Sequence, residues 1–191
     1  MPELEFRTAL VRQANVLAGH RVLDFGCGTG TLTLMVEAST PGAEVVGVDV
    51  DRGVLTIARD KLERNHSKIA LAQVSPGPLP FPDRSFDRVL SCLVFHHLRH
   101  DEKLAVLGEC RRVLHPGGEI HIADWGLPTS RLLRAGFLLT QLLDGFETTD
   151  DNVCGRMPDL ICQAGFDRVV ETDSFATALG SLRLLRGTKQ V

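Results

Sequence analysis

The sequence predicts an α/β protein with a doubly wound, mainly parallel sheet that is covered by helices on both faces. Three observations predict this fold. Short apolar runs alternate with stretches of helical spacing along most of the chain. The runs are apolar throughout, as in strands that are buried on both faces. A glycine-rich turn follows the first run, at the edge where such sheets bind their ligands.

A short helix is expected before the sheet, because Leu4, Leu10, Val11 and Leu17 have near-helical spacing within residues 4–18. Alternating strands and helices follow, and right-handed crossovers between them bring the carboxyl ends of the strands to one edge. The expected strands are Arg21–Phe25, Glu44–Asp49, Ile69–Gln73, Phe86–Cys92 and Glu119–Asp124. The expected helices between them are Gly30–Glu37, Asp51–Asn65 and Asp101–Leu114.

The C-terminal part of the chain has a different pattern. A helix is expected over Met157–Ala164, and two strand-like runs follow it, joined through Ala178-Leu179-Gly180. Runs joined by so short a connection form a hairpin. The sequence therefore predicts an antiparallel hairpin at the edge of the sheet.

Residues 126–156 form a segment between the last parallel strand and this tail, and apolar side chains surround much of a helix there. Three interpretations stay open: a helix packed on the sheet or at a dimer contact, an apolar lid on the substrate side, and association with a membrane surface. Arg131 and Arg134 give only a weak basic face for the last of these.

Composition and charge restrict the class of protein. The 191 residues are 43% hydrophobic and 24% charged, which is typical of one globular domain over residues 1–191. A net charge of −3 gives no overall reason to expect nucleic acid as a partner. No apolar run is long enough for a membrane span, and "MPELEFRTALVRQ" lacks a secretory core. The five scattered cysteines favour free thiols in the cytoplasm, without a metal site.

The glycine-rich turn lies in "VLDFGCGTGTL", and its spacing departs from the dinucleotide fingerprint. Gly26 and Gly28 fit G-x-G-x-x-G, but the third glycine comes early, at Gly30. Asp24, before the turn, would repel a pyrophosphate and suits a cation. Asp49, at the end of the second strand, can accept hydrogen bonds from both hydroxyls of a ribose. Together the acids favour S-adenosylmethionine over a nicotinamide cofactor, and a nucleotide-dependent dehydrogenase is the weaker alternative.

Four segments in order resemble the class I S-adenosylmethionine-dependent methyltransferases, of the small single-domain type similar to ubiquinone/menaquinone C-methyltransferases. They are "VLDFGCGTG", "VVGVDVD", "LPFPDRSFDRVLSCLVFHHL" and "ECRRVLHPGGEIHIAD". The resemblance is strong over about residues 20–125. It implies a Rossmann-like sheet of seven strands in the order 3-2-1-4-5-7-6, with an antiparallel seventh strand.

The resemblance also implies roles for individual residues. Asp24, Gly26, Cys27, Gly28 and Gly30 should surround the methionine end of the cofactor. Asp49 should hold the ribose, with Val50 against the adenine, and the backbone of Leu93 should approach the cofactor. Ser75 stands where the family usually has an acidic residue that accepts from the adenine amino group. Adenine would then be bound by backbone, or the cofactor would be held less tightly.

Candidate catalytic residues follow the fourth and fifth strands. His96 and His97 lie in "SCLVFHHLRHDE", and histidine titrates near neutral pH. The favoured interpretation of His97 is that it fixes the loop by hydrogen bonding, whereas a role of His96 as a substrate contact or base is the less favoured alternative. Asp124 either orients a substrate or caps the following segment. A metal cluster of Cys92, His96, His97 and His100 is the least favoured alternative.

The sequence thus predicts methyl transfer from S-adenosylmethionine, with S-adenosylhomocysteine as product, to a small and possibly apolar acceptor. No nucleic acid partner is expected, and the protein is expected to be a monomer or a homodimer. The alternative is a non-catalytic module or partner subunit that binds the cofactor, suggested by Ser75 and by the short segment before the first strand.

Overall fold

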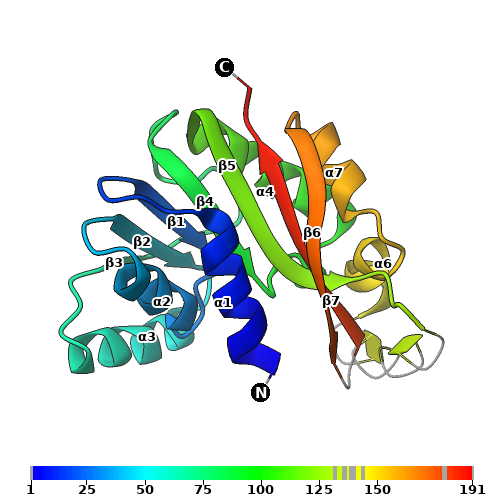
Figure 1. The fold of residues 1–191 in the computed structure, drawn as a ribbon, viewed down its shortest axis with the longest axis horizontal. Helices are drawn as coiled ribbons and strands as arrows, with labels where there is room; N and C mark the ends of the chain where they lie inside the picture. Colours follow the sequence, from blue (N-terminus) through cyan, green and yellow to red (C-terminus); the bar gives the residue numbers. More distant parts are fainter. Residues whose placement is uncertain are drawn as a thin grey trace.

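The computed structural model contains one sheet of seven strands in the order β3-β2-β1-β4-β5-β7-β6 (Figure 1). The structure describes residues 2–130, 133–134, 137, 141–142, 145–177 and 180–190. The strands are β1 (Arg21–Phe25), β2 (Glu44–Asp49), β3 (Ala70–Gln73), β4 (Phe86–Cys92), β5 (Leu114–Gly126), β6 (Asp167–Thr177) and β7 (Gly180–Thr188). The predicted order and the C-terminal hairpin are confirmed.

Strands β1 to β5 pair in parallel, whereas β7 is antiparallel to both of its neighbours. The parallel strands therefore end at one edge, which is the lower edge in Figure 1. The turn after β1, the end of β2 and the residues after β4 all lie at this edge. This arrangement brings the predicted site residues of three strands together.

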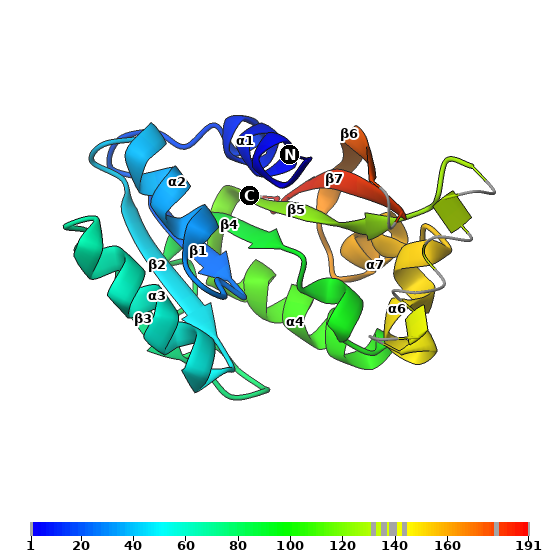
Figure 2. The same cartoon turned by 90° about the horizontal axis from the view of Figure 1, so that it is seen from below.

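Helices cover both faces of the sheet (Figure 2). One face carries α1 (Pro2–Ala14) and α2 (Thr31–Ser39), and α3 (Arg52–Arg64) packs against β2 and β3. The other face carries α4 (His100–Val113), α6 (Phe146–Val153) and α7 (Met157–Gln163). The short 3-10 helix η1 (Phe95–His97) connects β4 to α4 and packs against α6.

Two hydrophobic clusters, one on each face, hold these layers together. On the α1 side, Phe6 and Leu10 are buried against the sheet. On the α4 side, Leu107 and Leu160 are buried together with the inward-facing residues of the central strands. Burying each large apolar side chain contributes about 1.5–3 kcal/mol. Of the apolar residues predicted for the first helix, Leu10 is buried and Val11 packs against the same cluster, whereas Leu4 is exposed and Leu17 lies beyond the end of α1.

The largest difference from the predicted elements concerns β5, which begins at Leu114 rather than at Glu119. The run His115-Pro116-Gly117 has the composition of a turn. However, Leu114 pairs with Phe86 of β4, and the amide of Gly117 donates to the carbonyl of Lys189. Pairing with a C-terminal segment that is distant in sequence therefore extends the strand. Among the residues that the structure describes, no helix is long and apolar enough to cross a membrane.

Candidate active site

The turn after β1 is shaped by glycines whose backbone is left-handed. Gly26 has φ of +71°, and a Cβ at this position would collide with Val94, because it would lie 2.3 Å from a methyl carbon of that side chain. Gly28 has φ of +51°, but a Cβ at that position would meet nothing within 4 Å. Only glycine adopts this conformation without strain. The open space beside Gly28 lets a ligand approach the backbone closely.

Asp49 holds the turn in place. One of its carboxylate oxygens accepts from the amide of Gly28 at 2.8 Å, and the other accepts from the amide of Asp51 at 2.9 Å. Asp51 in turn caps the start of α3 by accepting from the amide of Gly53 at 2.6 Å. The second-strand carboxylate thus lies directly beside the glycine turn.

A cavity of about 500 Å³ opens at this edge of the sheet. Of the predicted site residues, those that line it are Asp24, Gly26, Cys27, Gly28, Asp49, Val50, Leu93 and His97. Gly30 lies just outside, where it precedes α2 and faces Leu62. Leu93 has φ of +59°, a strained conformation for a non-glycine residue, of the kind that is common at functional sites.

Asp24 is the buried acid of the cavity. One oxygen accepts from the hydroxyl of Thr33 at 2.6 Å, and the other has no hydrogen-bond partner. Burial raises the pKa of Asp24 from 3.8 to about 6, although the Thr33 hydrogen bond and the charge of Arg7 act in the opposite direction. A buried acceptor without a donor is costly. The cavity therefore fits a ligand that brings a cationic donor.

Arg7, on α1, also lines this cavity, and the sequence did not identify it. Its Nη2 donates to Glu3 at 2.8 Å, whereas its buried Nε has no partner. An acidic and a basic side chain therefore line the same cavity, and each has one buried polar atom without a hydrogen-bond partner. Such a pair matches a ligand with both an ammonium and a carboxylate group, as an amino acid has. No local sequence pattern marks Arg7, because only the packing of α1 brings it here.

Ser75 is exposed just beyond β3, and it is not among the residues that line the cavity. The preceding residue, Val74, is buried and does line the cavity. Its amide continues the pairing of β3 with β2 by donating to the carbonyl of Asp49 at 3.0 Å. Val50, Val54 and Val74 all line the cavity with apolar side chains.

Asp124 holds the η1 turn. One of its oxygens accepts from the amides of Val94, Phe95 and His96, and the other lies 2.7 Å from Nδ1 of His96 and from the amide of Trp125. Burial raises the pKa of Asp124, but the charge of His96 and these hydrogen bonds outweigh it and lower the pKa overall. The carboxylate therefore stabilises the turn rather than facing the cavity.

The sequence favoured His97 as the residue that fixes the loop, but in the structure His96 makes the contact that does so. His96 is buried and bonded to Asp124, so His96 is the residue that fixes the loop. His97 lines the cavity, and its ring centroid lies 3.9 Å from that of His96. Within the described ranges, no group of three or more histidine, cysteine or acidic residues is arranged to hold a metal ion.

The chain is similar in sequence to known proteins. A family model described as a methyltransferase domain matches residues 22–118. The chain is 39% identical to the demethylmenaquinone methyltransferase of Thermus thermophilus over 126 residues, which are 66% of this chain and 56% of that protein. It is 30% identical to the demethylmenaquinone methyltransferase of Symbiobacterium thermophilum, with 94% of this chain and 80% of that protein covered. The chain thus spans little more than half the length of the Thermus relative.

Solved structures share the fold. The YcgJ protein of Bacillus subtilis has a TM-score of 0.79 at 17% identity, covering 97% of this chain and 98% of that chain. A SAM-dependent methyltransferase of Aquifex aeolicus has a TM-score of 0.71 at 18% identity, covering 95% and 88%. Identities this low establish a common architecture only.

Proposed function

Because this chain belongs to the family of S-adenosylmethionine-dependent methyltransferases, we propose that it transfers a methyl group from S-adenosylmethionine to a small, apolar acceptor. The observation that carries the proposal is the unsatisfied oxygen of Asp24, buried in a cavity beside a glycine turn. A buried carboxylate suits a cationic cofactor and opposes a pyrophosphate.

The residues of the cavity divide between the parts of the cofactor. Asp24 and Arg7 are suited to its ammonium and carboxylate groups, and Gly28 of the glycine turn lies in contact with Asp49. Asp49 is suited to the ribose hydroxyls, and Val50, Val54 and Val74 to the adenine ring. When bound, the cofactor supplies a methyl group on a positively charged sulfur, so the protein mainly needs to align an acceptor with it.

Replacing Asp49 should weaken cofactor binding. In Asp49→Ala the acceptors for ribose hydroxyls are lost, so we expect S-adenosylhomocysteine to bind about 1–3 kcal/mol less tightly by calorimetry. Asp60→Ala, which removes an exposed carboxylate from α3, is the matched control and should bind normally. Equal affinities in the two variants would remove Asp49 from the ribose site.

We propose His97, which lines the cavity, as the general base that takes a proton from the methyl acceptor. We expect His97→Asn to lower the turnover number by about 10²–10⁴-fold, the usual contribution of a general base. The affinity for S-adenosylhomocysteine should change little, because Asp24 and Asp49 remain. Turnover within about twofold of the unsubstituted protein would show that the reaction needs no base at this position.

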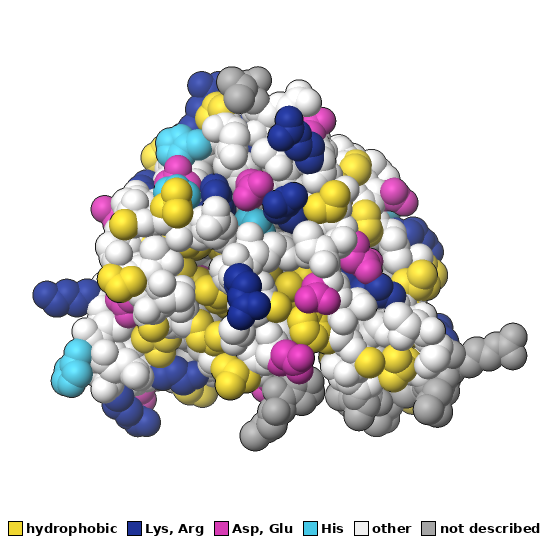
Figure 3. Space-filling model, viewed as in Figure 1, with side chains coloured by type: hydrophobic (Ala, Val, Ile, Leu, Met, Phe, Trp, Pro, Cys, Tyr) yellow, Lys and Arg dark blue, Asp and Glu magenta, His cyan; other side chains and the backbone are white. Residues whose placement is uncertain are grey.

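The apolar character of the acceptor rests on the sequence of residues 126–156, which we propose as the substrate-side wall or lid; residues 131–132, 135–136, 138–140 and 143–144 of this segment lie outside the described residues. Leu127 and Phe146 are more than half exposed there. Several relatives are named demethylmenaquinone methyltransferases, which makes demethylmenaquinone the first acceptor to test. On the face shown in Figure 3, side chains of both charge signs are interspersed, without a continuous basic surface.

We further propose that the protein acts in the cytoplasm, as a monomer or a homodimer, without a nucleic acid partner. The net charge of −3 and the five free cysteines support this proposal.

The experiment is turnover of S-adenosylmethionine labelled in its methyl group. Demethylmenaquinone and a panel of smaller phenols and amines serve as acceptors. Label should appear in an apolar acceptor, and His97→Asn should abolish most of it. Binding of the cofactor without transfer to any acceptor, or steeply salt-dependent transfer to RNA, would contradict the proposal.

A further inference from the structure

Lys103 is a charged residue inside the protein. It lies on α4, and its side chain is 0% exposed. Its Nζ donates to the carbonyl of Thr148 at 2.6 Å and lies 3.4 Å from a carboxylate oxygen of Asp151. Burying an ammonium group is costly unless partners replace the lost water. Both partners come from α6, so the burial of Lys103 depends on α6 being docked.

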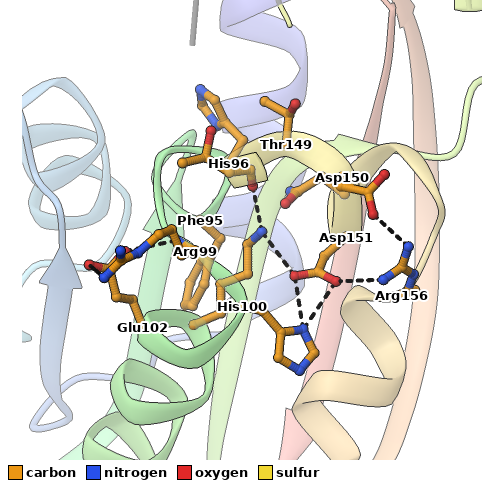
Figure 4. Close-up of polar contacts among 12 residues, drawn as sticks. Phe95, His96, Arg99, His100, Glu102, Thr149, Asp150, Asp151 and Arg156 are labelled. Atoms are coloured by element: carbon orange, nitrogen blue, oxygen red, sulfur yellow. Dashed lines mark hydrogen bonds and ion pairs between the residues drawn. The ribbon is translucent and has the colours of Figure 1, made fainter. Parts of the chain in front are cut away.

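Asp151 is the centre of a wider cluster (Figure 4). It is 3% exposed. Besides Lys103, its oxygens lie 3.2 Å from Nδ1 of His100 and 3.3 Å from Nη1 of Arg156. His100 begins α4, whereas Arg156 follows α6. One buried carboxylate of α6 is thus held by basic side chains from two parts of the chain.

The docked helix lies against the candidate active site. α6 packs on η1, the turn that carries His96 and His97, and on the end of β5. The buried Asn152 of α6 donates to the carbonyl of Trp125 at 3.0 Å. Thr149, also on α6, accepts from Gln141 at 3.2 Å, which connects the helix to the segment before it. The position of α6 therefore bears on both the η1 turn and the proposed substrate-side wall.

The cluster is separate from the cofactor cavity. None of the residues that line that cavity belongs to α6, and Lys103 does not line it either. A loss of this contact would change the acceptor side without removing any group proposed to hold the cofactor.

We propose that Lys103 is a positioning residue for methyl transfer: its contacts with Thr148 and Asp151 hold α6 against the η1 turn and fix the acceptor side of the site. Lys103 acts through α6 and touches neither cofactor nor acceptor. The inference rests on the proposed function for its kinetic consequence, but the docking of α6 can be measured without any substrate.

The test compares Lys103→Met with Arg111→Met. Methionine has a similar length to lysine without its charge. Arg111 is a second cation of α4, whose Nε donates to the carbonyl of Gly165, away from α6. In Lys103→Met, amide hydrogen exchange within residues 146–153 should become at least about tenfold faster than in Arg111→Met. If Lys103→Met does not fold, Lys103→Gln takes its place, because glutamine keeps a donor for the carbonyl of Thr148. Amide hydrogen exchange within residues 146–153 should again be faster than in Arg111→Met, but by a smaller factor.

Two further readouts separate positioning from a general loss of stability. The affinity of Lys103→Met for S-adenosylhomocysteine should stay within about twofold, while kcat/KM for the acceptor falls at least about tenfold, mainly through KM. Unchanged exchange in α6, equal effects in Arg111→Met, or a parallel loss of cofactor affinity would overturn the inference. If the unsubstituted protein binds no adenosyl ligand, the proposed function fails, and the exchange measurement still tests the docking of α6.

Discussion

Asp24→Asn should make the ligand-free protein more stable and should sharply weaken its binding of the cofactor. Because burial raises the pKa of Asp24 from 3.8 to about 6, ionising this carboxyl at pH 7 costs the folded state about 3 kcal/mol. Asparagine avoids that cost and can still accept from Thr33. Removing the charge also removes the partner of a cationic ligand group, which should weaken S-adenosylhomocysteine binding by about 10–100-fold.

The gain in stability should depend on pH in a definite direction. A carboxyl whose folded pKa is raised destabilises the folded state wherever the unfolded chain ionises more readily, so the cost begins near pH 3.8, grows with pH and is complete above about pH 6. As the pH falls from 6 towards 3.8, the unsubstituted protein recovers this free energy, so the two proteins should become equally stable. Urea titrations at several pH values measure the difference. A variant that is less stable at pH 7 would show that Asp24 is held mainly by partners within the protein.

Asp124→Ala should have the largest effect on folding. The substitution leaves the side chain of His96 and several buried backbone amides without their acceptor. Removing one partner of a buried ionic pair costs about 3–5 kcal/mol. We expect a loss of this size in the free energy of unfolding, together with loss of turnover, because the η1 turn carries His97.

The neighbouring Trp125 is the single tryptophan of the chain, so its fluorescence reports on this turn during urea unfolding. Asp101→Ala, which removes an exposed acid near the start of α4, is the matched control and should change stability by less than about 0.5 kcal/mol. A loss below about 1 kcal/mol in Asp124→Ala would mean that water or another acceptor replaces the carboxylate.

The parts of the fold that the sequence predicted well depend on local pattern. The bounds of β1, β2 and β4 agree with the predicted ranges, because central parallel strands are continuous apolar runs between turn residues. The glycine turn and Asp49 also lie where motif spacing put them. The extent of β5 was predicted poorly, since its first residues pair through contacts that are distant in sequence.

Several features of the candidate site depend on tertiary packing rather than on local sequence. Arg7 reaches the cavity only because α1 docks on the sheet. His96 fixes the loop because its Nδ1 contacts Asp124, which lies 28 residues after His96 in the chain. Ser75 was placed by counting from a later motif, whereas β3 continues its pairing through Val74 and leaves Ser75 exposed. Neither hydrophobic periodicity nor the local spacing of motifs predicts contacts between segments that are this distant in sequence.

The most direct measurement is a calorimetric titration of the protein at about pH 7.5 with S-adenosylhomocysteine, alongside NAD and 5′-methylthioadenosine, which lacks the amino-acid part. We predict saturable binding of S-adenosylhomocysteine at one site, weaker binding of 5′-methylthioadenosine because Asp24 and Arg7 stay unsatisfied, and no binding of NAD. Binding of NAD, or the absence of binding by any adenosyl ligand, would contradict the account of this cavity.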